Sequence, residues 1–209
     1  MSTISASTTT TTAYKVTADT TGTLVLQTGA TPTTALTIDA SQNVTFAKPL
    51  QGASLSSITL GTAQNTTSGT AIDFTGIPSW VKRITVILNG VSENAGNNIG
   101  VQLGTSGGVE TSGYTGFAVS SGAGGTAVTA LSAGFDYRNA GGASSIMYGT
   151  FVIVSIGSSN TWVCTATGTG ASIGYNTSGG KTLSGTLDRV RLYSAGTFDA
   201  GSVNIMYEG

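Results

Sequence analysis

The sequence predicts an all-β protein, in which a thin N-terminal β-structured stem and an extended arm precede a C-terminal β-sandwich of jelly-roll type. Charged residues make up 8% of the 209 residues, against about 25% in an average soluble domain, so charged helix faces are scarce. The chain holds 31 glycines and is rich in Ser and Thr, a composition that favours strands and turns over helices. Short alternating apolar and polar segments, separated by turn residues, recur from Gly69 to the C-terminus.

Residues 1–22 form the predicted arm. They are rich in Ser and Thr, with an unbroken threonine run from Thr8 to Thr12, and lack the basic and apolar regions of a secretory signal. Such a segment buries too little apolar surface to order alone. We expect it to attach the protein to a partner.

Residues 23–50 form the predicted stem, which contains three minimal strands separated by turn-rich segments. Each strand places two apolar residues on one side. These six residues are Leu24, Leu26, Leu36, Ile38, Val44 and Phe46. Isolated ribbons of this size are marginal in water, so we expect identical neighbours to cover the six side chains in a homotrimer.

The segment Ala35–Phe46, ALTIDASQNVTF, resembles the ALTIDxxGNV-type repeat of bacteriophage tail-fibre and related virion-fibre proteins. The resemblance implies a trimeric β-structured shaft. Gln42 stands where the repeat has glycine, so we expect a different turn. The segments Ile72–Pro78 and Val203–Tyr207 also resemble the opening and the terminal strand of small β-sandwich domains on phage fibres and capsids.

Residues 51–68 are predicted to be a linker, and residues 69–209 the sandwich. In the second strand of the sandwich, Ile84, Val86 and Leu88 share one face, and Asn89-Gly90 predicts a hairpin turn. At least two of Val152, Ile153 and Val154 are expected to be fully buried. The expected strands are Ala71–Thr75, Val81–Leu88, Ile99–Leu103, Tyr114–Val119, Ala127–Phe135, Ile146–Ile156, Thr161–Thr167, Leu183–Leu187, Arg189–Ser194 and Ser202–Tyr207.

Composition argues against several chemical functions. The chain has no histidine, which excludes Ser-His-Asp and Cys-His catalysis, and its carboxylates are scattered, so we expect no enzymatic activity, cofactor or metal. Cys164 is alone and is expected to be buried beside Trp162 and Ala166 on one strand face. A net charge of −1 without a basic stripe argues against nucleic-acid binding. The longest apolar run, Phe151–Val154, argues against a membrane span.

These observations favour a non-enzymatic structural protein of a bacteriophage particle. We expect a trimeric fibre or fibre-like appendage, located in the virion, that is anchored to other virion proteins by its N-terminal region and displays the sandwich. Two alternatives stay open: a capsid decoration or cement protein, and a carbohydrate-binding module. Trp80 follows Pro78-Ser79 in a turn and is the candidate surface aromatic for binding a host-surface glycan.

Overall fold

The structure is a computed structural model that describes residues 21–28, 31, 33–48, 58–96, 98–138, 143, 145–157, 159–170 and 172–209. The regular elements of these residues are strands, which confirms the all-β prediction. Contacts within the chain divide it into two compact units, Met1–Leu55 and Ser56–Gly209. All but the last two residues of the predicted arm lie outside the described residues.

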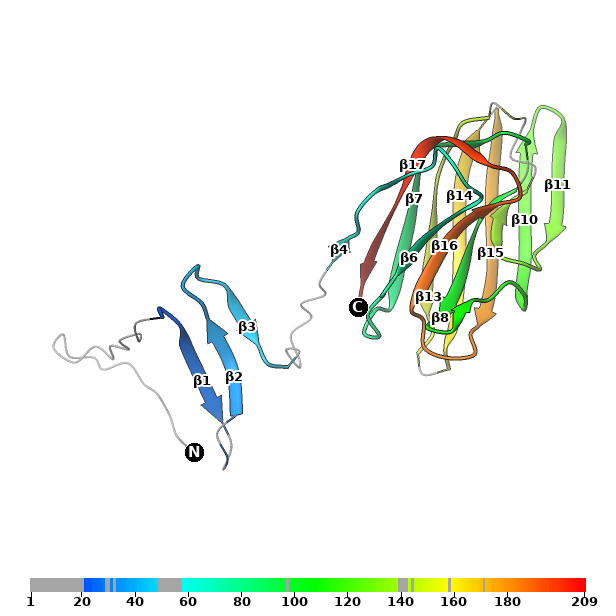
Figure 1. Cartoon of the computed structure of the whole chain (residues 1–209). Helices are drawn as coiled ribbons and strands as arrows, with labels where there is room; N and C mark the ends of the chain where they lie inside the picture. The colour runs from blue at the N-terminus through cyan, green and yellow to red at the C-terminus, as the bar shows by residue number, and fades with distance from the viewer. Residues whose placement is uncertain are drawn as a thin grey trace, which may run out of the picture. The chain divides into compact units, whose positions relative to one another are not determined.

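The N-terminal unit contains a three-stranded antiparallel sheet in the order β1-β2-β3 (Figure 1). Its strands are β1 (Leu24–Thr28), β2 (Thr33–Ile38) and β3 (Val44–Phe46). All three coincide with the minimal strands that the sequence predicts for the stem.

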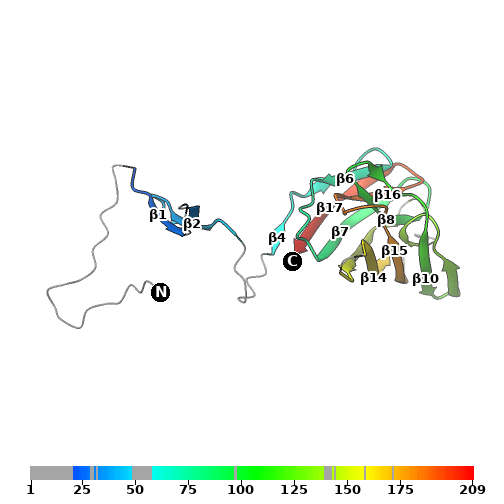
Figure 2. The same ribbon diagram turned by 90° about the horizontal axis from the view of Figure 1, so that it is seen from below.

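The C-terminal unit is a sandwich of two antiparallel sheets with unequal sizes. Figure 2 shows the larger sheet curling beneath the smaller one, so that both enclose a single core. The larger sheet has the order β11-β10-β15-β14-β13-β7-β17-β4, with β5 also paired to β17, and the smaller has the order β12-β8-β16-β6, with β9 paired to β8. The bounds are β4 (Thr59–Leu60), β5 (Gln64–Asn65), β6 (Ala71–Thr75), β7 (Arg83–Glu93), β8 (Ile99–Thr105), β9 (Gly108–Val109), β10 (Tyr114–Gly122), β11 (Gly125–Ala130), β12 (Phe135–Tyr137), β13 (Met147–Ser155), β14 (Thr161–Gly170), β15 (Ile173–Thr182), β16 (Arg189–Ser194) and β17 (Phe198–Glu208).

The core is built from the inward-facing residues of both sheets. Ile84, Val86 and Leu88 on β7 are buried, as their period-two spacing predicts. On β14 the predicted buried face is also confirmed, with Cys164 fully enclosed. Burial disfavours the thiolate and raises the pKa of Cys164, so this thiol is a packing group.

The prediction of a hairpin turn at Asn89-Gly90 is wrong. Strand β7 continues to Glu93, and Gly90 lies inside it with a φ of 66°. The pairing of β7 with both neighbouring strands shifts register here, so the glycine forms a β-bulge rather than a turn. The positive φ angle that glycine supplies suits either structure, and the flanking sequence alone does not distinguish them.

Three further strand predictions differ from the structure. The expected strand Ala127–Phe135 is divided between β11 and β12, which belong to different sheets. Leu183–Leu187 forms no strand, although both terminal leucines are buried and anchor this loop in the core. On β13 the expected run of adjacent buried residues is wrong, because only Ile153 of Val152–Val154 is buried and the pleat turns its neighbours outward.

The predicted linker, residues 51–68, also differs in part. Its first seven residues lie outside the described residues. Beyond them, β4 and β5 pair with β17, and Gly61 N donates a hydrogen bond of 2.7 Å to Ile205 O. Each of these strands has only two residues and is flanked by small polar residues, so no alternating apolar pattern predicts it. The end of the predicted linker is therefore part of the sandwich.

Candidate association and binding surfaces

The stem sheet aligns all six predicted contact residues in two rows across its strands. Leu24 lies opposite Ile38, which lies opposite Val44, and Leu26 lies opposite Leu36, which lies opposite Phe46. Directly opposite residues of an antiparallel ladder point to the same face, and the two rows are two residues apart along each strand. The six side chains therefore form one apolar block.

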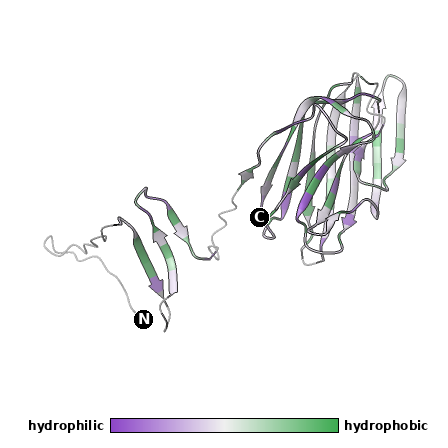
Figure 3. Cartoon of the chain, viewed as in Figure 1, coloured by the Kyte–Doolittle hydropathy of each residue, from purple (hydrophilic) through white to green (hydrophobic). Residues whose placement is uncertain are grey.

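A single chain leaves this block open to water. Leu26, Val44 and Phe46 are 47%, 50% and 43% exposed, and the other three residues are half-buried. Figure 3 shows hydrophobic colour on all three stem strands. A core of ordinary packing leaves such side chains nearly inaccessible, so the exposed block makes the stem sheet a candidate association surface.

The turn between β2 and β3 is held by one carboxylate. Asp39 Oδ1 accepts hydrogen bonds of 2.9 Å from the backbone N–H groups of Ser41 and Asn43, and Oδ2 accepts another from the Asn43 side chain. The bond from the Asn43 side chain, with the backbone bonds, lowers the pKa of Asp39. Gln42 lies in this turn with a φ of 69°, in the left-handed region where side chains are unfavourable.

Trp80, the predicted surface aromatic, lies in a turn and is 42% exposed. Its ring centroid is 5.9 Å from that of Tyr207, with the two planes inclined at 54°. Tyr207 is half-buried against the core, so it supports the more exposed indole. Sequence analysis missed this partner, because the pair forms only when β17 returns beside the start of β7.

Tyr207 also lines a cleft of about 420 Å³ at the edge of the sandwich. Phe74, Ile77 and Ile205 supply apolar lining, while Gln64 donates a 3.0 Å hydrogen bond from its side-chain amide to the backbone carbonyl of Asp73. Ligand sites combine an apolar lining with a few polar groups in clefts of this size. The cleft and the neighbouring aromatic pair are the candidate ligand site.

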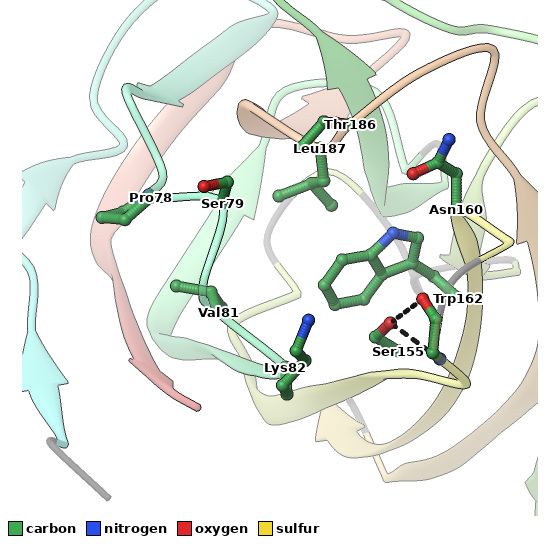
Figure 4. A pocket seen from close by; sticks show the side chains of 10 residues that line it. Pro78, Ser79, Val81, Lys82, Ser155, Asn160, Trp162, Thr186 and Leu187 are labelled. Carbon is green, nitrogen blue, oxygen red and sulfur yellow. Dashed lines mark hydrogen bonds between the residues drawn. The ribbon is translucent and has the colours of Figure 1, made fainter. Parts of the chain in front are cut away.

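A second hollow lies above Trp162, as Figure 4 shows. The indole ring, which is 5% exposed, forms one wall, and the side chains of Lys82, Ser155, Asn160 and Leu187 surround it. Its volume is about 50 Å³. A cavity measured in this way needs about 10–15 Å³ to accommodate one water molecule, so this hollow has room for water.

Several of the scattered carboxylates stabilise local structure. Asp73 is bound by both Arg191 Nε and Nη2, at 2.6 and 2.7 Å, and the hydrogen bond from this arginine lowers the pKa of Asp73. Similarly, Glu110 receives a hydrogen bond from Ser184 and pairs with Lys181, and Asp136 pairs with Arg138. Among the described residues, no three Asp, Glu or Cys side chains are grouped to hold a metal ion.

Comparisons with known proteins give no relative: no family model, no curated protein and no solved structure matches this chain. Within the described part of the chain, no helix has the length and apolar character needed to cross a membrane.

Proposed function

We propose that the protein is a non-enzymatic structural component of a bacteriophage particle, a homotrimeric fibre or fibre-like appendage. The observation that carries the proposal is the apolar block of the stem, which a single chain leaves exposed. Fully burying one Leu or Phe side chain contributes about 1.5–3 kcal/mol. Three copies around an axis cover all three blocks at once, and this gain offsets the entropy of ordering a thin stem.

The division of the chain into two units supports the same function. In this proposal the stem unit supplies association, and the sandwich unit has a core of its own. The N-terminal arm, residues 1–22, attaches the trimer to other virion proteins in this proposal. Residues 1–12 of this arm have no charged side chain, so their Ser and Thr residues can contact a partner without a charged side chain to desolvate.

The test of trimer formation is a change of charge within the apolar block. Val44→Asp with Phe46→Asp places six carboxylates near the trimer axis, and we expect a monomer by light scattering with the sandwich still folded. Thr45→Asp is the matched control, because Thr45 lies between these residues and points to the opposite face, so it should remain a trimer. A monomeric unmodified protein, both free and on particles, would favour a decoration protein instead.

The test of anchoring is removal of residues 1–12. We expect the shortened protein to remain a trimer and to fail to join particles in a complementation assay. Incorporation of the shortened protein at the normal level would contradict attachment through this segment.

A second candidate function is carbohydrate binding, which the cleft beside Trp80 and Tyr207 favours. Aromatic faces stack on the apolar faces of sugar rings, and the adjoining amide and backbone groups suit hydroxyls. We expect Trp80→Ala to abolish retention on a glycan array. Phe117→Ala is the control, because Phe117 is 59% exposed but lies on the outer side of the larger sheet. Equal retention of both variants would exclude this site.

A further inference from the structure

Among the described residues, one edge of the larger sheet has no neighbouring strand. Strand β11 is the terminal strand of the sheet and pairs only with β10 among the described strands (Figure 1). All six of its residues are exposed. An unpaired edge of this kind presents backbone donors and acceptors to which another strand can bind.

The direction of these backbone groups follows from the hairpin. Leu131 N donates a 3.0 Å hydrogen bond to Gly116 O on β10, and the direction of such groups alternates along an antiparallel strand. Thr126, Val128 and Ala130 therefore turn their N–H and C=O groups away from β10. The guanidinium of Arg138 reaches one of them, the carbonyl of Ala130, at 3.4 Å.

Other edges of the sandwich carry the features that prevent pairing. Strand β6 presents Asp73 with its bound arginine, and β4 and β5 have two residues each. The β10–β11 hairpin lacks such protection. Its strands are longer, and residues 114–131 include no charged side chain and no proline. Phe117 and Val128, on one face of the hairpin, are 59% and 62% exposed, and Figure 3 shows β11 without hydrophilic colour.

We propose that β11 pairs antiparallel with β11 of a second copy of this chain, which joins two nine-stranded sheets into one. Self-pairing is favoured because the edge is self-complementary. With Val128 opposite its own copy, Thr126 lies opposite Ala130 and Ala127 opposite Thr129, so every pair is uncharged and of moderate size. In this register all three outward-facing residues exchange hydrogen bonds with the partner, and the Ala130 carbonyl, which has two lone pairs, accepts from both the partner and Arg138.

This contact is separate from the stem. A strand paired with its own copy is related by a twofold axis, whereas the proposed stem has a threefold axis. The edge therefore joins one trimer to another, and its formation does not depend on whether the stem associates.

The test compares three substitutions of Val128 in the full chain. Val128→Lys places two ammonium groups opposite each other, and Val128→Pro removes an outward N–H while leaving the bonds to β10 in place. Val128→Thr, the control, keeps a β-branched side chain and the N–H. In sedimentation velocity over a range of concentrations, we expect the Lys and Pro variants to need at least about tenfold more protein for the same association.

Equal masses for all four proteins at every concentration would overturn the proposal. Loss of association in Val128→Lys alone would also overturn it, because a side-chain contact and not strand pairing would then be responsible. Hydrogen exchange of the unmodified protein gives a measurement that needs no variant. The amides of Thr126, Val128 and Ala130 should become protected as concentration rises, and unprotected amides at all concentrations would refute strand pairing.

Discussion

Replacement of Gln42 by glycine should strengthen the stem. Gln42 has a φ of 69°, and this left-handed conformation costs a residue with a side chain about 1–2 kcal/mol, a cost that glycine avoids. At about 1 kcal/mol for each chain, three chains contribute about 3 kcal/mol to the trimer. That energy changes the trimer dissociation constant by about 150-fold, which lowers the midpoint concentration of association by about 12-fold, since the midpoint varies as the square root of this constant.

Sedimentation equilibrium of Gln42→Gly and the unmodified chain measures this midpoint directly. Gln42→Ala is the control, because alanine removes the same side-chain atoms beyond Cβ and keeps the unfavourable conformation. We expect no gain from alanine. A midpoint that is the same for Gly and the unmodified chain, or a gain shared by Ala, would refute the link between this turn and association.

Three further predictions concern stability. Ile153→Ala should lower the free energy of unfolding by about 2–5 kcal/mol, and Val154→Ala, at a more exposed position, should lower it by much less. Denaturant titration of both variants would measure these losses, and equal losses would contradict the burial pattern of β13. Gly201→Ala should destabilise the sandwich by more than about 1 kcal/mol, because its φ is 92° and its Cβ would lie 2.2 Å from Gly90 O; an unchanged melting temperature would show that the bulge can move aside. The stem should become less stable as the pH falls, because the folded-state pKa of Asp39 lies below its ordinary value of 3.8. The ionised carboxylate stabilises the turn fully above pH 3.8, and this stabilisation is lost as the pH falls through the folded-state pKa. Trimer fraction against pH measures this effect, and Asp39→Asn should remove the dependence.

Local alternation predicted the strands with the clearest signal. The inward faces of β7 and β14 have apolar residues at every second position, so their burial follows from the pleat alone. The six residues of the stem block were also predicted from alternation. Their alignment into two rows depends on the register of the three strands, which the two turns set. The spacing of the apolar residues in the sequence does not predict this register.

Predictions failed where pairing partners distant in the sequence determine the structure. Gly90 forms a bulge because β7 continues along two neighbours, and β4 and β5 are strands only because β17 provides an edge for them. The ring pair of Trp80 and Tyr207 likewise joins residues far apart in the chain. A period within one segment carries no information about such partners.

The bulge at Gly90 has a counterpart in the facing strand. Between Asn89 and Ser92, strand β7 has one residue more than β17, and between Phe198 and Ala200 strand β17 has one more than β7. The first irregularity shifts the register of the two strands by one residue, and the second shifts it back. Loss of Gly90 alone would leave the extra residue of β17 uncompensated and shift the pairing of Glu93 by one residue, whereas loss of Asp199 as well would leave the two strands in step. Insertions and deletions in this pair of strands should therefore be tolerated in matched pairs, one in each strand.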